Sequence, residues 1–453
     1  MVMSSIEATV VASVLPTVTR DLGGFSLYRW IVSAYMLASA VVMPVLGRLS
    51  DTYGRRPVLF GSLLLFLLGS AASGAAGSMQ ELIVFRVVQG AGAGGLIVLA
   101  VTVLGDIYEP AERARVQGAL GALGTAAGAA GPLVGALILR TANWRWAFYV
   151  NLPIGFVAWL LVKKTYVDSH QPHRHRFDVI GAVLLSLGIV GLLLSAGEHV
   201  DYAGVAASLA LLAVFVWHER TVREPLMPLD LVRRAAVAFP CMADFARCGA
   251  VFALMTYLPL YAAVRSGASA VNAGLILTPV ILGSFVGSSL GGRLAHRYTL
   301  KRISQAALLA LAVASLGYAA LVIWGGNRFL GTSALFVIGA AQGAGYLVLM
   351  LTVQVGVNRS DMGTANGVNT LAKYVGGALG VGLLGSFVVA ADSAGSGAGG
   401  VGSLATPAML LGFDRLFVAI GALALVSLLC TFWFPPGLRL GEEGAHAMGE
   451  GAM

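Results

Sequence analysis

The chain has 453 residues, of which 58% are hydrophobic and only 11% are charged, and its formal net charge is +8. A soluble globular protein carries about 25% charged and about 45–50% apolar residues, so the composition excludes an ordinary soluble domain and indicates an integral membrane protein with several spans. The net charge does not require a nucleic-acid partner, because basic cytoplasmic loops of a membrane protein produce the same balance.

Apolar segments long enough to cross a bilayer recur along the whole chain. A helix of about 20 residues spans the roughly 30 Å of hydrocarbon, and blocks such as 178–196 lack the alternation that a transmembrane β-strand requires. We therefore expect an all-α integral membrane protein. The fourteen predicted helices cover residues 2–19, 28–46, 58–76, 80–103, 116–139, 147–163, 178–196, 201–217, 236–263, 270–291, 303–324, 330–354, 363–390 and 413–434.

Arginine and lysine are distributed unevenly between the loops on the two sides of these spans. They are concentrated in one set, for example at 47–58, 163–176 and 292–303, and the positive-inside rule places that set in the cytoplasm. Because the predicted number of spans is even, both termini are expected to be cytoplasmic. Abundant alanine and glycine favour a bacterial host on compositional grounds, so the predicted location is a bacterial cytoplasmic membrane.

The first predicted span contains a carboxylate, Glu7, in an otherwise small or apolar run. From Glu7 to Arg20 is roughly 20 Å of helix, so spanning about 30 Å requires about seven residues before Glu7. Only six precede it. We therefore expect the first helix to be clipped at its cytoplasmic end, by a start codon placed too far downstream or by genuine truncation.

The loop GRLSDTYGRRPV at 47–58 combines glycines with charges. Glycine permits positive φ and close approach, the aspartate can accept hydrogen bonds at a helix N-terminus, and the arginines can pair with carboxylates or phosphates of the inner leaflet. A simple topology anchor is the alternative reading of this loop. The residues of interest are Gly47, Arg48, Asp51, Gly54, Arg55 and Arg56.

An internal repeat relates this loop to GRLAHRYTLKRI at 292–303. Both segments join the second and third helices of a six-helix set if two helices are inserted between the sets, and parallel repeats of this kind occur in transporters. The predicted organisation is an N-terminal six-helix bundle at 1–165, two inserted helices at 166–225, a C-terminal six-helix bundle at 226–440 and a cytoplasmic tail at 441–453.

Two features of the first half mark functional helices. Arg86 lies several residues inside the fourth predicted span, where a charge is costly and indicates a functional site, and Gln89 shares its helix face. The fifth span is rich in small residues that allow close helix contacts, with a proline that kinks the helix. Its principal residues are Gly118, Gly128, Gly131, Pro132 and Gly135.

Charges also fall inside predicted spans of the second half. Asp244 and Arg247 are one helical turn apart and are expected to pair, in either a substrate-facing or a structural role, and Lys373 lies in the thirteenth span. Interfacial belts are the commoner role of aromatic residues, but a cavity for aromatic cations would also use such rings. The candidate residues of a substrate cavity are Tyr35, Gln89, Asp244, Arg247, Tyr257, Tyr346 and Lys373.

Five blocks resemble the major facilitator superfamily, specifically its fourteen-helix drug:proton antiporter branch. The first-helix block is EATVVASVLP, beginning at Glu7, and the loop at 47–58 resembles the motif between helices 2 and 3. LIVFRVVQGAGAGG at 82–95 and GALGALGTAAGAAGPLVGA at 118–136 resemble the helix-4 and antiporter motifs. WRWAFYVNLPIG at 144–155 resembles a block specific to this branch.

The resemblance assigns expected roles to these residues. It implies that Glu7 carries the proton and attracts the cationic substrate, with Arg86 facing the cavity and tuning that acid. It also implies that the loop at 47–58 is a cytoplasmic latch that holds one conformation. His296 stands in the second copy where the first copy has Asp51, so the second half is expected to lack the same charge relay.

The predicted function is proton-coupled efflux of drugs or other amphipathic or cationic molecules by alternating access. The alternative is a transporter of one metabolite or self-made antibiotic on the same fold. No Walker A or His-Glu-x-x-His sequence occurs, and the Gly-x-Ser-x-Gly match at 287–291 lies inside a predicted membrane span, where it forms no nucleophile elbow; this argues against an ATP-driven pump and an intramembrane enzyme. The expected partners are small molecules, protons and lipid, with a periplasmic adaptor only in a Gram-negative host; no cofactor, metal or nucleic acid is expected.

Overall fold

Helices make up the regular secondary structure of the part of the chain that the computed structural model describes. Long apolar helices fit the expected all-α membrane protein, because a helix satisfies its own backbone hydrogen bonds in hydrocarbon. The described residues are 2–108, 116, 130–131, 133–166, 178–195, 201–222, 225, 229–266, 275–357, 362–395 and 407–439.

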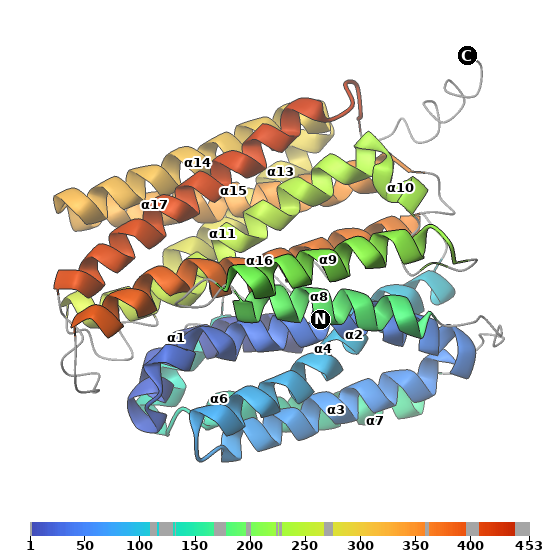
Figure 1. Ribbon diagram of the computed structural model, residues 1–453, viewed down its shortest axis with the longest axis horizontal. Helices are drawn as coiled ribbons and strands as arrows, with labels where there is room; N and C mark the ends of the chain where they lie inside the picture. The colour runs from blue at the N-terminus through green and yellow to red at the C-terminus, as the bar shows by residue number, and fades with distance from the viewer. Residues whose placement is uncertain are drawn as a thin grey trace. The chain divides into compact units, whose positions relative to one another are not determined.

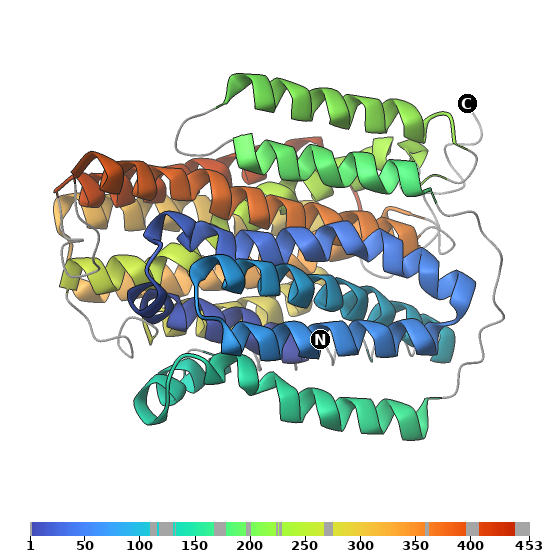
Figure 2. The ribbon, with the colours of Figure 1, turned by 60° about the horizontal axis from the view of Figure 1, so that its bottom comes forward.

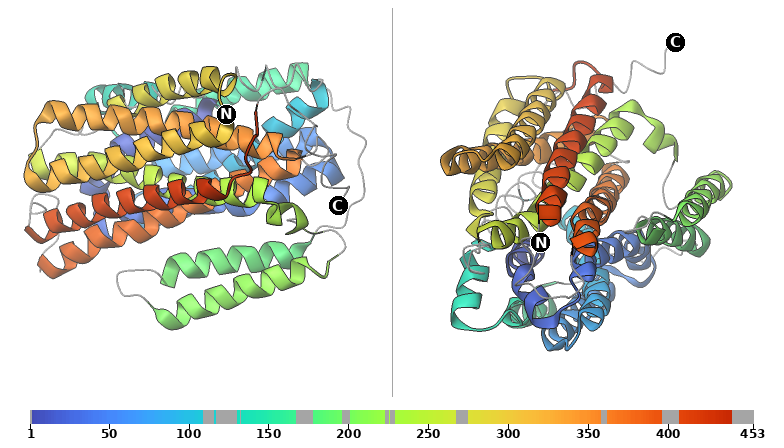
Figure 3. Two further views of the ribbon diagram at one scale, coloured as in Figure 1. Left: turned by 90° about the horizontal axis from the view of Figure 1, so that it is seen from above. Right: turned by 60° about the vertical axis from the view of Figure 1, so that its left-hand side comes forward.

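The residues cluster into two units, and unit 1 comprises Met1–Leu226, Met255–Leu277 and Val381–Gly412. Both α2 and α3 pack along α4, as the blue helices of Figure 2 show. The helices α8 and α9 pack side by side as a pair (Figure 3). The helices of the first segment are α1 (Val2–Leu22), η1 (Phe25–Leu27), α2 (Tyr28–Tyr53), α3 (Arg55–Ala75), α4 (Met79–Ile107), α6 (Trp146–Tyr149), α7 (Asn151–Thr165), α8 (Val179–Ser195) and α9 (Tyr202–Glu219).

Unit 2 comprises Met227–Leu254, Thr278–Gly380 and Phe413–Met453. Within it α13 and α14 pack on α15 (Figure 1). The long helices α11, α16 and α17 contribute residues to both units. The remaining helices are α10 (Leu229–Arg233), α11 (Ala235–Ser266), α13 (Thr278–Ala295), α14 (Leu300–Trp324), α15 (Arg328–Val355), α16 (Met362–Gly395), α17 (Pro407–Cys430) and η3 (Thr431–Trp433).

Helix ends follow from local sequence. The hydroxyl of Ser78 accepts a hydrogen bond from the backbone N–H of Glu81 over 3.2 Å and so caps α4, which is a common role of serine at this position. Gly54 separates α2 from α3 with φ of 95°, and Gly325 ends α14 with φ of 74°. Only glycine adopts such angles without strain, so the sequence fixes these two breaks.

Equivalent helix pairs in the two units support the internal repeat. The second helix of the repeat packs on the fourth in both, as α2 on α4 and α13 on α15. Each contact requires glycine, because a methyl group at Gly90 would collide with the carbonyl oxygen of Tyr35, and one at Gly287 with that of Ala340. Small residues let helix backbones approach this closely. The two repeated sequence segments lie at the ends of α2 and α13.

Ten described helices are long and apolar enough to cross a membrane, and they coincide with ten of the predicted spans. At three further predictions, 2–19, 178–196 and 270–291, helices α1, α8 and α13 are present but do not belong to these ten. The predicted span 116–139 lies partly outside the described residues. The count of fourteen and the division into two bundles with an inserted pair therefore stay predictions.

Candidate functional site

A buried ion pair joins α1 to α4 within unit 1. The guanidinium of Arg86 donates a hydrogen bond from Nη1 to Oε1 of Glu7, and the two residues are 2% and 1% exposed. A single charge inside a membrane protein is costly, and pairing it with an opposite charge lowers that cost. Two residues that are 79 positions apart in the sequence thus form one site with no net formal charge.

Three further contacts hold Arg86 in place. Its Nη1 also donates to Oε1 of Gln89 over 2.8 Å, and its Nε donates to the backbone carbonyl of Ile31 over 3.1 Å. The centroid of the Tyr35 ring lies 4.0 Å from the guanidinium carbon, which makes a cation–π contact. Gln89 and Tyr35, both predicted for a substrate cavity, therefore surround the ion pair.

The two oxygens of the Glu7 carboxylate have different surroundings. Oε1 accepts the hydrogen bond from Arg86, whereas Oε2 is buried and has no hydrogen-bond partner among the described residues. A buried polar atom without a partner is unusual and calls for an explanation such as a bound ion, water or proton. The geometry therefore leaves one carboxylate oxygen available to accept a proton while the other stays paired.

A polar network that sequence reasoning missed extends from Gln89. Its Nε2 donates to Oγ of Ser70 over 3.1 Å, and Nδ2 of Asn151 donates to the same oxygen over 3.0 Å. Ser70 in turn donates to the backbone carbonyl of Phe148 over 2.8 Å. The network ties α3, α4, α6 and α7 together. The sequence signal that could have predicted this network was Asn151, whose side-chain amide is a polar group within the 144–155 block.

The glycines of the antiporter motif contact the helix that carries the carboxylate. A methyl group at Gly131 would collide with Oγ1 of Thr9, and one at Gly135 would collide with Oγ of Ser13. Both contacts lie within two turns of Glu7 on α1. Small residues in this motif thus let its helix pack directly against the site helix. Outside the described residues lie Gly118, Gly128 and Pro132.

The segment at 47–58 is held by contacts between the end of α2 and the start of α3. Arg55 is 6% exposed and donates from Nη1 to Oγ of Ser50 over 2.7 Å. Ser50 donates to the backbone carbonyl of Gly47 over 2.6 Å. The Arg55–Ser50 bond connects the start of α3 to the end of α2 across the Gly54 break. The latch role stays a prediction, and the side chains of Arg48 and Asp51 lie outside the described part of the structure.

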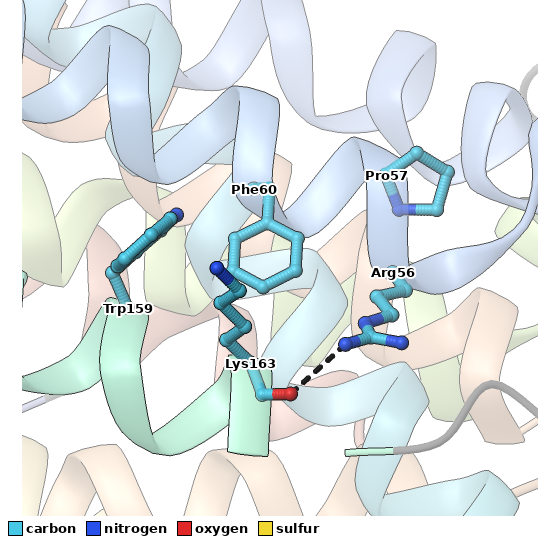
Figure 4. Close-up of a pocket in the computed structure, with 5 residues that line it drawn as sticks. All are labelled: Arg56, Pro57, Phe60, Trp159 and Lys163. Atoms are coloured by element: carbon cyan, nitrogen blue, oxygen red, sulfur yellow. Dashed lines mark hydrogen bonds between the residues drawn. The ribbon is translucent and has the colours of Figure 1, made fainter. Parts of the chain in front are cut away.

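Arg56 binds the C-terminal turn of α7. Its Nη2 donates to the backbone carbonyl of Lys163 over 2.9 Å, as Figure 4 shows. The rings of Phe60 and Trp159 and the side chain of Pro57 line the same pocket. A cation at a helix C-terminus is favourable, because the exposed carbonyls there carry partial negative charge. Arg56 therefore fastens the last helix of the first predicted bundle to α3.

The repeat-related cation makes the equivalent contact in unit 2. Lys301, at the start of α14, donates from Nζ to the backbone carbonyls of Phe432 and Phe434 over 2.7 Å and 2.9 Å. These carbonyls follow the end of α17. A basic residue recurs at this position of the sequence repeat, as Arg56 and Lys301. In each unit it binds the end of the last predicted helix of the repeat.

A second buried charged cluster lies within unit 2, where α11, α15 and α16 meet. Asp244 and Arg247 pair as expected: Nε of Arg247 donates to Oδ1 of Asp244 over 2.8 Å, and Nη2 lies 2.6 Å from the same oxygen. Nζ of Lys373 lies 3.9 Å from Oδ2 of the same carboxylate. The Tyr346 ring centroid is 4.7 Å from that Nζ and 5.8 Å from the Arg247 guanidinium. Four of the predicted cavity residues therefore form one cluster.

Tyr257, the remaining predicted cavity residue, is buried in a different place. Its hydroxyl donates to the backbone carbonyl of Val381 over 3.1 Å, and its ring lies 5.7 Å from that of Tyr28. The hydroxyl of Tyr28 donates to the carbonyl of Thr256 over 2.8 Å. Both hydroxyls are thus used by backbone groups within unit 1. Among the described residues no group of three or more His, Cys, Asp or Glu side chains is arranged to hold a metal.

Comparisons with known proteins bear on the whole arrangement. A family model described as Major Facilitator Superfamily matches residues 1–381. The Multidrug transporter protein MdtP of Bacillus subtilis (strain 168) is 31% identical over 396 residues, which cover 85% of this chain and 73% of that protein. The Acurin A biosynthesis cluster MFS-type transporter of Aspergillus aculeatus is 33% identical over 295 residues, covering 61% of this chain and 53% of that protein.

A solved structure shares the fold at low sequence identity. The crystal structure of a D-xylose-proton symporter superposes with a TM-score of 0.68 at 14% identity, covering 96% of this chain and 95% of that chain. Similarity at this level concerns the fold alone.

Proposed function

Because the chain belongs to the major facilitator superfamily, a family of membrane transporters and not of enzymes, we propose that it exports drugs or other amphipathic, cationic small molecules in exchange for protons. The proposed site of action is a bacterial cytoplasmic membrane, with both termini in the cytoplasm. Export proceeds by alternating access of the two predicted bundles, and the proton gradient is the source of energy.

The observation that carries this proposal is the asymmetric carboxylate of Glu7. Oε1 is paired with Arg86, and Oε2 has no hydrogen-bond partner among the described residues. In the ionised state this carboxylate attracts a cation, and protonation at Oε2 removes the charge and releases the cation. Arg86 is also bound by Gln89 and the Ile31 carbonyl, so Glu7 is not its only partner. The site can therefore alternate between a proton and a cationic substrate.

The names of the relatives support two candidate substrate ranges, one broad and one narrow. One is named a multidrug transporter, which favours export of many compounds. Another is named for a biosynthesis cluster, which favours the second candidate, a dedicated exporter of one metabolite or self-made antibiotic. A susceptibility panel on an efflux-deficient host, with and without this gene, separates them. Protection against several unrelated cationic drugs supports the first candidate, and protection against one compound class supports the second.

Proton coupling is tested with ethidium in proteoliposomes that contain the full-length protein. We expect an imposed pH gradient to drive ethidium transport by the wild type, and the Glu7→Gln variant to lose this response. The matched control is Glu81→Gln, which makes the same substitution at an exposed carboxylate near the start of α4. Gradient-driven transport by Glu7→Gln at the wild-type rate would remove Glu7 as the proton carrier.

A further inference from the structure

The buried cluster of unit 2 contains more positive than negative charge. Asp244 contributes one negative charge, and Arg247 and Lys373 contribute two positive charges, so the formal sum is +1. Asp244 is fully buried and Arg247 is 1% exposed. A charge without a counter-charge at such a site is costly. The cluster thus differs from the Glu7–Arg86 pair, in which the charges cancel.

Hydrogen-bond donors of both cations remain available. Nε and Nη2 of Arg247 converge on one oxygen of Asp244, and Nη1 of Arg247 has no partner among the described residues. The separation of 3.9 Å between Nζ of Lys373 and Oδ2 of Asp244 is longer than a hydrogen bond. Guanidinium and ammonium groups bind oxyanions through short, charge-assisted hydrogen bonds. The cluster therefore has the donors that an additional anionic group needs.

The accessible edge of the cluster is formed by an aromatic ring and an ammonium group. Tyr346 is 38% exposed and the Lys373 side chain is 12% exposed, whereas Asp244 and Arg247 lie beneath them. Gly345 gives the stem of Arg247 room, because a Cβ there would lie only 3.3 Å from Cδ of the arginine. Tyr346 and Lys373 are therefore the more accessible members of the cluster.

A second proton site at Asp244 fits this arrangement less well. Oδ2 of Asp244, like Oε2 of Glu7, has no hydrogen-bond partner among the described residues. Protonating Asp244, however, would raise the formal charge of the cluster from +1 to +2, with both cations within 4 Å of the carboxyl group, whereas the Glu7 site has only one cation. Adding an anion would instead bring the charge to zero and occupy the available donors. The electrostatics thus favour an anionic ligand over proton uptake at this position.

We propose that the Asp244–Arg247–Lys373 cluster binds the carboxylate of a transported aromatic molecule. The carboxylate meets Lys373 and Nη1 of Arg247, the ring stacks on Tyr346, and Asp244 orients the guanidinium. This inference rests on the proposed export of small molecules and extends its substrate class to zwitterions, which carry a cation and a carboxylate in one molecule. Lys373 then determines specificity for the carboxylate.

Two dyes that differ only at one carboxylate test the proposal. Rhodamine B carries a free aromatic carboxylate, and its ethyl ester lacks that negative charge. Binding of each dye to the purified full-length protein is measured by fluorescence anisotropy, without a proton gradient. We expect the wild type to bind rhodamine B about tenfold more tightly than the ester, the scale of one charge-assisted hydrogen bond. Equal wild-type affinities would overturn the proposal.

Variants of Lys373 separate binding from a structural role. Lys373→Gln should lose about tenfold in rhodamine B affinity while its ester affinity changes by less than about twofold, and Lys373→Arg should restore rhodamine B binding. Lys164→Gln, which removes an exposed lysine from α7, should leave both affinities unchanged. Unchanged rhodamine B binding by Lys373→Gln, or an equal loss for both dyes, would overturn the carboxylate site.

The outcomes for this site and for proton-driven export are distinguishable. If Lys373→Gln binds both dyes as the wild type does while ethidium transport still responds to the pH gradient, the carboxylate site is wrong and the export proposal stands. If rhodamine B binding depends on Lys373 but the gradient drives no ethidium transport, the carboxylate site stands and the proton-coupled export proposal is wrong.

Discussion

Replacing Arg86 by methionine removes the cation beside Glu7 and keeps an unbranched side chain. Glu7 is 1% exposed, and its Oε2 already has no hydrogen-bond partner among the described residues. The variant therefore leaves a buried carboxylate without its counter-charge. Removing one partner of a buried ion pair costs about 3–5 kcal/mol of the free energy of unfolding, so we expect Arg86→Met to be strongly destabilised.

Glu7→Gln should lower the stability of the wild-type protein but raise the stability of the Arg86→Met variant. In the wild type it costs about 1–3 kcal/mol, because Arg86 retains Gln89, the Ile31 carbonyl and the Tyr35 ring. In the Arg86→Met background the same change removes the unpaired charge, so it should stabilise the protein. The double variant is then more stable than Arg86→Met alone, with a coupling energy of at least about 1 kcal/mol, the smallest cost of Glu7→Gln in the wild type.

Thermal unfolding of the four purified proteins in one detergent measures this cycle. The apparent Tm of Glu7→Gln/Arg86→Met should lie above that of Arg86→Met. A second cycle that combines Arg86→Met with the exposed Glu81→Gln is the control. Its effects should add, because Glu81 and Arg86, although both on α4, share no hydrogen-bond partner among the residues that the structure describes. A double variant at Glu7 and Arg86 whose loss equals the sum of the two single losses would refute the buried pair.

Three further predictions concern helix contacts and the latch. Gly287→Ala places a methyl group against the Ala340 carbonyl oxygen and should lower the free energy of unfolding by about 1–3 kcal/mol, measured by thermal unfolding. The control is Gly317→Ala, whose new methyl group meets no atom within 4 Å and should leave stability unchanged or slightly raised. Gly131→Ala pushes on α1 and should slow ethidium transport in proteoliposomes; an unchanged rate contradicts the role of that contact. Asp51→Ala should slow the same transport, and a wild-type rate would remove the latch.

The sequence predicted much of the first charged site because charges are rare inside membrane spans. Arg86 and Glu7 each stand out in an apolar run, and a buried charge requires a partner; the resemblance to the antiporter branch then linked the two residues. The network of Ser70 and Asn151 was not predictable in the same way. Neutral polar residues are common in these helices, and their pairing depends on how α3, α4 and α7 are rotated against each other.

Contacts to the backbone and across distant helices also escaped prediction. The repeat identified Arg56 and Lys301 as equivalent cations, but both bind carbonyl oxygens, and every residue has a carbonyl, so the sequence carries no signal for the partner. Asp244 and Arg247 were expected to pair because they are one turn apart. The position of Lys373 beside them requires the packing of α16 on α11, which local periodicity does not specify.

The contact of Arg56 with the end of α7 fixes the point at which the chain leaves the first predicted bundle. α7 ends at Thr165, and the pair α8 and α9 begins only at Val179. Because the final turn of α7 is anchored to α3, helices can be gained or lost after it during evolution without moving the helix that precedes them. Lys301 gives unit 2 an equally fixed point after α17. Each repeat therefore ends at an anchored junction, which makes it a module that tolerates additions at its boundary.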